Sequence, residues 1–568
     1  MEKLTVAVTL PLKSLLCSRL LAAILITNML TMSLCNLFEL KTITTVFIYP
    51  AFFLMTLPYL LSGKNKRTSM KITPQMVLWV FTMWMLLTLV RLPYSLEWLP
   101  GNQVFAQFDD SPRLANLIGM TLSDNYPCKN PLNQNYLLSY YYAALMPLSF
   151  LKLAIPLLTL KDVLFLGNTL YHFLILFSIL EVSNLLLPSR RSIWIMIYLC
   201  TIFGGLDWLA DILLRGNGLI AHHEGWHKCD LLHGNAQISS FFTGLIWAFP
   251  HFAAAHACVL AFVFLYYFIF QYRYVKPLAI GLLLISGFHS SIFALLPMGL
   301  IGIVEHRYVR KILPQFNILL PLIVIFAVPL FLYTDRIIYT GMRFARFRIS
   351  FTDIFVLDKI LSFPIWVVLT SAVDLAFIPI SLIFLYAKFT HKEKMYFLAS
   401  LFFFLSTYIV AFAQGNNYSM RGMFVPTFIF FLLFAKYAPD LPIIKKIICS
   451  SRTAVLAIIT LVLFSAGTFL EIGWCAKMTY GSMTVLGNSF GIAPPEYIVS
   501  RNYRAISRDS SIKQYERSPN DCIGDKIPEM PHLRCAHFNA EKLMDVPLDN
   551  MDHWEKEFLR LPKRNRYW

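Results

Sequence analysis

Long apolar runs separated by short polar segments occupy the chain from about Leu20 to residue 473. A helix needs about 20 mostly apolar residues to cross the hydrocarbon core of a bilayer. The stretch 277–305 is longer than one crossing and is interrupted at 287–291, so we interpret it as a hairpin of two bent helices. The pattern predicts an all-α fold, a polytopic transmembrane helical bundle with about thirteen crossings. The other predicted crossings are 18–38, 43–62, 75–92, 163–187, 192–205, 240–271, 312–333, 361–388, 395–413, 421–438 and 454–473.

The composition agrees with a chain that lies in lipid. Of the 568 residues, 57% are hydrophobic and 14% are charged, whereas soluble domains contain about 45–50% apolar and about 25% charged residues. The first apolar run is followed closely by a second one and lacks a small-residue cleavage site, so we expect a permanent anchor and not a signal peptide.

Basic residues set the predicted orientation. The formal net charge is +17, and Lys and Arg gather in short blocks between apolar runs, which is typical of cytoplasmic loops and not of a groove for nucleic acid. The blocks share one side only if the Tyr-rich segment 136–157 does not cross and lies in the membrane interface as an amphipathic helix. The blocks are Lys64, Lys66, Arg67 and Lys71; Arg190 and Arg191; Arg273 and Lys276; Arg307, Arg310 and Lys311; Lys388, Lys392 and Lys394; and Lys445, Lys446 and Arg452.

This topology predicts three regions and places the C-terminus outside the cell, with the N-terminus in the cytoplasm. The regions are an N-terminal pair of transmembrane helices (1–70), a transmembrane core (71–473) and an extracytoplasmic C-terminal region (474–568). In the last region, Cys522 and Cys535 could pair on an oxidising face or remain free thiols. The extracytoplasmic loops of the core are 93–135, 206–239, 334–360 and 414–420.

The first of these loops carries adjacent carboxylates, Asp109 and Asp110. Such a pair just beyond a membrane span can act as a general base or hold a divalent cation. Asp110 or Ser111 in front of Pro112 is also an ordinary start for a helix over 113–121. The two roles are compatible for adjacent residues, and both remain open.

The second loop contains Asp207 and a run rich in histidine. His223-Glu224-x-x-His227 matches the zincin motif, in which two histidines one helical turn apart bind zinc and the glutamate acts as the base. Gly225 inside the required helix and the shortness of the loop argue against this interpretation. A metal site of another kind is the remaining alternative, with ligands drawn from His222, His223, His227 and Asp230.

Arginines and amides in the later segments predict binding of an anion. Arg336 and Arg343 belong to a positive rim in the third loop that could bind phosphate, or could belong to an amphipathic helix resting on headgroups. Arg421 opens a predicted span beside Asn417, where a buried charge requires a partner, so we expect an anionic ligand there.

Two further polar residues fall inside predicted spans. His289, at the tip of the hairpin, could orient a hydroxyl or a phosphate, or be hydrogen-bonded within the bundle. Asp374 lies deeper, and we interpret it as structural or coupling rather than catalytic.

Four stretches in a fixed order resemble an uncharacterised bacterial family of polytopic membrane proteins within the GT-C glycosyltransferase superfamily. The acidic outward loop, the Tyr-rich interfacial segment and the short helical hairpin also resemble that architecture, and the resemblance covers about residues 90–440. The stretches are Phe203-Gly204-Gly205-Leu206-Asp207; Gln237-Ile238-Ser239-Ser240 with Trp247-Ala248-Phe249-Pro250-His251; 287–297; and Met420-Arg421-Gly422 with Pro426.

The resemblance implies a bacterial inner-membrane enzyme that takes a sugar from a polyprenyl-phosphate donor and gives it to a glycan, lipid or protein acceptor. It implies that Asp110, with Asp109 beside it, activates the acceptor hydroxyl, and that Arg421, with His289, meets the carrier phosphate. A divalent cation could share in charge stabilisation, membrane lipid surrounds the protein, and nucleic acid is not a partner. A transporter or lipid flippase, which Asp374 would favour, is the alternative, and a membrane zinc metalloprotease is the third.

Overall fold

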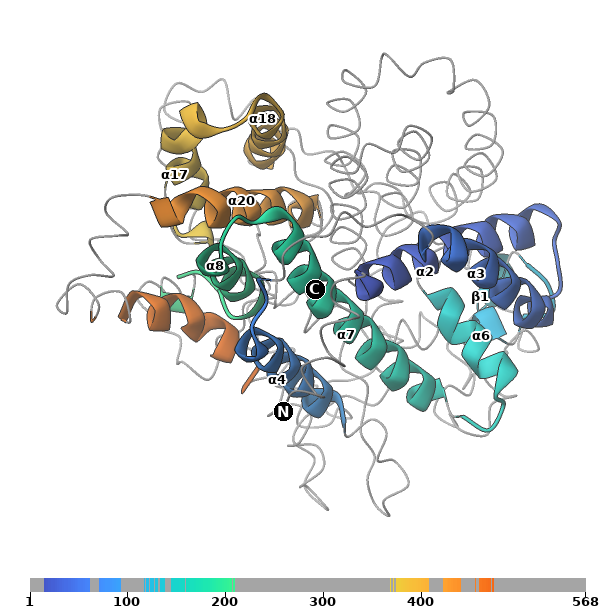
Figure 1. Cartoon of the computed structure of the whole chain (residues 1–568). Coiled ribbons are helices and arrows are strands. Elements are labelled where there is room, and N and C mark those ends of the chain that lie inside the picture. Colours follow the sequence, from blue (N-terminus) through green and yellow to red (C-terminus); the bar gives the residue numbers. More distant parts are fainter. Residues whose placement is uncertain are drawn as a thin grey trace, which may run out of the picture.

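The computed structural model describes the helices of the N-terminal part of the chain and those that follow residue 373. Its described residues are 15–61, 71–92, 145–158, 160–206, 208–209, 374–407 and 422–440, parts of 117–137 and of 459–473, and residues 368, 371 and 455. These residues are mostly helical, in agreement with the predicted all-α class (Figure 1).

The longest helix among the described residues, α7 (Leu160–Leu186), runs obliquely through the middle of Figure 1. Within the described part of the chain, its segment Asp162–Leu186 is the one helix that is long and apolar enough to cross a membrane. A long core helix of a soluble protein meets the same criteria. The bundle of about thirteen crossings therefore remains a prediction.

Helices α2 (Leu16–Leu37) and α4 (Pro74–Arg91) pack on α7, and a third helix, α3 (Thr45–Leu61), packs on α2. All three match predicted apolar windows. The indole N–H of Trp84 donates to the Thr169 carbonyl, and the Lys71 ammonium donates to the Leu187 carbonyl. Because residue numbers rise on α4 as they fall on α7, the two helices are antiparallel.

Helix α2 is also antiparallel to α7. Ser18 contacts Glu181, and the amide of Asn28 donates to the Tyr171 hydroxyl, 3.5 Å away. The Tyr49 hydroxyl on α3 donates to the other side of the same Asn28 amide, at 3.0 Å. A buried polar relay thus connects α3, α2 and α7, and it satisfies groups that would be costly to bury alone.

The bundle has two distinct ends. At the C-terminal end of α7, Lys71 precedes α4, and Arg190 and Arg191 open α8 (Arg190–Thr201). We call this the basic end. At the other end of α7, Thr42 N donates to the Asp124 carbonyl and Tyr126 N donates to the Leu40 carbonyl. We call this the first-loop end, because α4 finishes there and residues 124–126 return there.

A second group of helices is joined to the first through α8. It consists of α17 (Ile378–Leu385), the short helix η7 (Tyr386–Lys388), α18 (His391–Ser406), α20 (Phe424–Tyr437) and η8 (Ala438–Asp440). Helix α20 packs on α8, α17 and α18, and it runs across Figure 1 at a clear angle to α7. The interior here is aromatic, and Phe397, Phe404 and Phe430 are all buried.

The segment 136–157 differs from its prediction. Tyr136 lies in strand β2 (Asn133–Leu137), which pairs antiparallel with β1 (Lys129–Asn130), and the helix that follows is α6 (Met146–Ala154). Pro147 lies at the start of α6, where its fixed backbone angle favours the first turn of a helix and so sets the later helix boundary. With 9 residues, α6 is too short to cross a bilayer, which agrees with the expectation that this segment does not cross.

Two predicted crossings are also interrupted. Helix α8 has 12 residues and ends at Thr201, a length of about 18 Å against about 30 Å of hydrocarbon. In the window 361–388, Ala376 and Phe377 have positive φ angles of 48° and 59°, and α17 starts only after them. Hydropathy located these segments, but it does not register a change of backbone direction inside an apolar run.

Large apolar side chains point outward along two helices. On α3, Phe47 is 73% exposed and Leu54 67%; on α4, Leu78 is 66% exposed, with Phe81 on the same face. Residues spaced by three or seven share one helix face. Contiguous exposed apolar faces of this kind mark a surface that contacts lipid or protein.

Candidate functional site: the helix break after α8 and its buried polar supports

Every residue predicted to act in catalysis or binding lies outside the described residues. Their mutual distances therefore stay predictions, and so does the grouping of the first loop with Arg421. These residues are Asp109, Asp110, Asp207, His223, Glu224, His227, His289, Arg336, Arg343, Asn417 and Arg421.

The flanks of the first loop are described and lie at one end of the bundle. Helix α4 finishes at Arg91, and the chain is next hydrogen-bonded to the segment after α2 through Asp124 and Tyr126. The described residues of the predicted helix 113–121, namely 117 and 119–121, are helical. The carboxylates of this loop are thus carried by a segment that starts and ends at the first-loop end.

The motif Phe203-Gly204-Gly205-Leu206 coincides with the break after α8. Gly204 N donates to the Phe464 carbonyl at 2.7 Å, and Gly205 has a φ of 83°, which a residue with a side chain rarely adopts. A Cβ at Gly204 would lie 2.7 Å from the backbone nitrogen of Thr468. The two glycines therefore allow the chain to turn and to touch the helical segment 459–470.

Hydrogen bonds to main-chain carbonyls fix this contact. The indole N–H of Trp208 donates to the Leu463 carbonyl at 2.9 Å, and the Tyr198 hydroxyl donates to the Leu461 carbonyl at 3.0 Å. The break also lies level with the first third of α4, because the Trp79 indole donates to the hydroxyl of Thr201. Non-helical backbone at such a depth is tolerated where protein surrounds it and its polar groups are paired.

A buried carboxylate on α7 closes the start of α2. Glu181 accepts hydrogen bonds from the backbone N–H groups of Cys17 (3.0 Å) and Ser18 (2.8 Å) and from the Ser18 hydroxyl (2.6 Å). The N-cap residue Leu15 has no side-chain acceptor. The first turn of a helix leaves unpaired N–H groups and a partial positive charge, and a carboxylate satisfies both.

The charge of Glu181 is balanced inside the same cluster. Arg19, itself buried, interacts favourably with the carboxylate, and Ser178 exchanges a 2.8 Å hydrogen bond with Ser18. These donors fix the position of the Glu181 side chain between the two helices. The cluster is therefore a structural clamp between α2 and α7, and its donors already engage both carboxylate oxygens.

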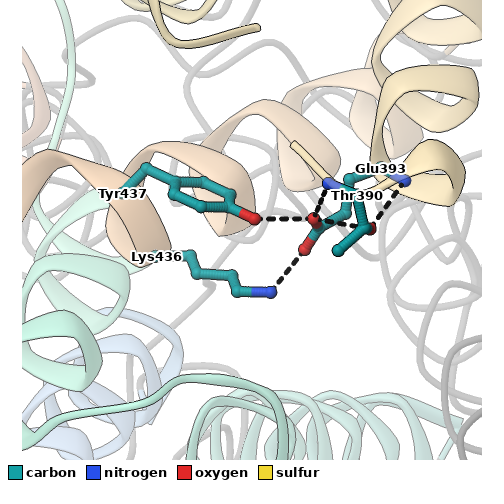
Figure 2. A network of polar contacts seen from close by, with 4 residues as sticks. All are labelled: Thr390, Glu393, Lys436 and Tyr437. Carbon is teal, nitrogen blue, oxygen red and sulfur yellow. Dashed lines mark hydrogen bonds and ion pairs between the residues drawn. The ribbon is translucent and has the colours of Figure 1, made fainter. Parts of the chain in front are cut away.

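A second polar network joins α18 to the end of α20 (Figure 2). The Glu393 carboxylate accepts from Lys436 Nζ at 2.5 Å, from the Tyr437 hydroxyl at 2.6 Å and from the Thr390 N–H at 2.8 Å. Thr390 and Glu393 form a capping box, in which each side chain satisfies the other residue's backbone N–H. This network lies before the predicted span 395–413.

The environment of Glu393 favours its ionised form. Burial alone would raise the pKa of the Glu393 carboxyl, but the hydrogen bonds from Lys436, Tyr437 and Thr390 outweigh it, so the pKa lies below the ordinary value of 4.5. A general acid is expected to have a raised pKa, whereas the pKa of Glu393 is lowered. Glu393 is therefore an ion-paired structural acid.

Asp374 is buried, with 7% of its surface exposed, shortly before the backbone turn that precedes α17. Its depth within a membrane span stays a prediction from the sequence. Among the described residues, no group of three or more His, Cys, Asp or Glu side chains could hold a metal ion. The histidine-rich loop lies outside them.

Comparisons with known proteins give no assignment: no family model, no curated protein and no solved structure matches the chain.

Sequence reasoning missed Glu181 and Glu393. A signal existed for Glu393, since Thr390-x-x-Glu393 is the pattern of a capping box. For Glu181 the signal was weaker: a single acid inside an apolar run, whose partners are 163 and 164 residues away.

Proposed function

We propose that the chain is a membrane glycosyltransferase that moves a sugar from a polyprenyl-phosphate-linked donor to a glycan, lipid or protein acceptor on the extracytoplasmic face. The observation that supports it is the polarity of the first bundle. The segments that flank Asp109 and Asp110 meet the bundle at the first-loop end, and the basic blocks flank its other end. Basic blocks prefer the cytoplasmic side, so this arrangement favours an outward acidic loop.

The proposed reaction needs one proton transfer and one displacement. Asp110 takes the proton of the acceptor hydroxyl, whose oxygen forms a bond to the anomeric carbon of the sugar. The bond from that carbon to the carrier phosphate breaks, and the polyprenyl phosphate leaves with the electron pair. Arg421 stabilises the charge that develops on the phosphate. Attack opposite to the leaving group inverts the configuration of the sugar.

The test is sugar transfer by the purified full chain with Asp110→Asn. The variant should transfer sugar about 10²–10⁴-fold more slowly, the usual contribution of a general base. Asp124→Asn is the matched control, because Asp124 is an exposed aspartate at the end of the same loop, and it should keep its activity within about twofold. Full activity of the Asp110→Asn variant would remove the proposed base.

One observation favours the alternative of a transporter or flippase, namely the burial of Asp374 inside a predicted span. Loss of ion-coupled uptake in Asp374→Asn, with sugar transfer unaffected or absent, would support that reading. Glu224→Gln separates the third candidate, since a zinc metalloprotease would lose its base and a glycosyltransferase would keep its activity.

A further inference from the structure

The basic end of the first bundle carries an excess of positive charge. Arg190 and Arg191 are exposed in the first turn of α8, and Lys71 lies beside the last carbonyl groups of α7. The sequence between α3 and α4 holds Lys64, Lys66 and Arg67 and no acid, but it lies outside the described residues. Helices α2, α4, α7 and α8 contain two acids, Asp162 and Glu181; Asp162 lies in the first turn of α7, at the opposite end, and Glu181 is buried. The short helix η8, which packs on α8, adds one more acid, Asp440.

The first-loop end has a different balance. Its described residues include the acids Glu39, Asp124 and Asp162 together with the bases Lys41 and Lys152. The contrast between the two ends is thus a difference in acids as much as in bases. Exposed bases that outnumber the nearby acids attract anions at short range, within roughly a Debye length of 8–10 Å.

Beside the basic end, the outward face of α4 is apolar through Leu78 and Phe81. A ligand that meets both this surface and the basic end must have an apolar part and an anionic head. Free phosphate offers only the second, and an acidic phospholipid offers both. Each Lys or Arg close to a membrane containing such lipids contributes about 1 kcal/mol to binding.

We propose that the basic end binds the headgroups of anionic phospholipids through Arg190, Arg191 and Lys71, with the acyl chains against the outward face of α4. The proposal rests on the membrane location within the proposed function and is independent of the catalytic role of Asp110. The occupant is a lipid of the surrounding bilayer, distinct from the sugar donor, which is expected at the other end.

The experiment measures binding of short-chain phosphatidylglycerol to the detergent-solubilised full chain, followed by the rise in its unfolding temperature. Arg190→Gln should weaken the apparent Kd about fivefold, and the double variant Arg190→Gln/Arg191→Gln about 25-fold, for one and two lost charges. Lys41→Gln is the matched control, because Lys41 is an exposed base at the first-loop end. It should bind phosphatidylglycerol as the unaltered chain does.

Phosphatidylcholine and inorganic phosphate serve as the two comparison ligands, and neither should raise the unfolding temperature. Binding that is unchanged in the double variant, or weakened equally by Lys41→Gln, would overturn the proposal. An equal response to inorganic phosphate would also overturn it, in favour of a simple anion site. Asp110→Asn should bind the lipid normally, so that failure of the catalytic proposal is seen separately in sugar transfer.

Discussion

Ser18 donates its backbone N–H to the Glu181 carboxylate across 2.8 Å, although the two residues are 163 positions apart. This hydrogen bond joins α2, the first described helix, to α7, the longest described helix. It also supplies a cap that the local sequence at Leu15 lacks.

The clamp predicts a clear loss of stability for Glu181→Gln. The amide replaces one acceptor oxygen with a donor that faces N–H groups, so we expect the free energy of unfolding to fall by about 1–3 kcal/mol. Ser178→Ala, which removes one neutral hydrogen bond to Ser18, should cost about 0.5–1.5 kcal/mol. Thermal unfolding of the two variants measures the difference, and an unaltered Glu181→Gln protein would contradict the clamp.

The close approach at Gly204 predicts that Gly204→Ala destabilises the protein. The new methyl group would meet backbone of the segment 459–470, and such overpacking typically costs about 1–3 kcal/mol. Gly473→Ala is the control, because a Cβ there has no atom within 4 Å. Equal unfolding temperatures for the two variants would show that the contact is loose.

The low pKa of Glu393 predicts a pH-dependent contribution to stability. The pKa of the Glu393 carboxyl is lower in the folded state than its unfolded value of 4.5. Its ionised form therefore stabilises the fold at pH values above 4.5, and this contribution is lost as the pH falls through the lower, folded pKa. Unfolding of the unaltered chain and of Glu393→Gln should therefore differ at pH 7 and converge in acid. Exposed Glu39→Gln should show no such difference.

The two ends of the bundle predict opposite accessibility in the membrane. In a chain whose other reactive cysteines are replaced by serine, Lys41→Cys should react with an impermeant thiol reagent in intact cells. Arg190→Cys should react only after permeabilisation, because basic blocks remain in the cytoplasm. Both parent residues are exposed, so burial would not hide either thiol. Labelling of both from one side would reject the predicted orientation.

Hydrophobic periodicity predicted the positions of long helices well and those of short ones poorly. The windows 18–38, 43–62, 75–92 and 163–187 agree with α2, α3, α4 and α7 to within about three residues. The windows 192–205 and 361–388 differ from α8 and α17 because a glycine break in the first and two residues with positive φ in the second interrupt runs whose composition stays apolar. Hydropathy averaged over a window does not detect such local breaks in a helix.

Long-range polar contacts were beyond prediction for a different reason. Glu181 and its donors are too far apart in sequence for any local pattern to connect them, whereas the Thr390–Glu393 capping box follows from a spacing of three. The predicted catalytic residues lie outside the described residues, so their grouping is still a hypothesis drawn from the sequence.

The end of α8 beside Trp79 has a geometric consequence for the second loop. Helix α8 is about 18 Å long, and its last residue, Thr201, lies beside Trp79, in the first third of α4. At Leu209 the chain therefore still has most of the length of α4 ahead of it, and the predicted second loop must cover that ascent before it can reach the outer surface. Histidines 222–227 come at least 13 residues later, which is enough chain, at roughly 3.3 Å per extended residue, to make that ascent.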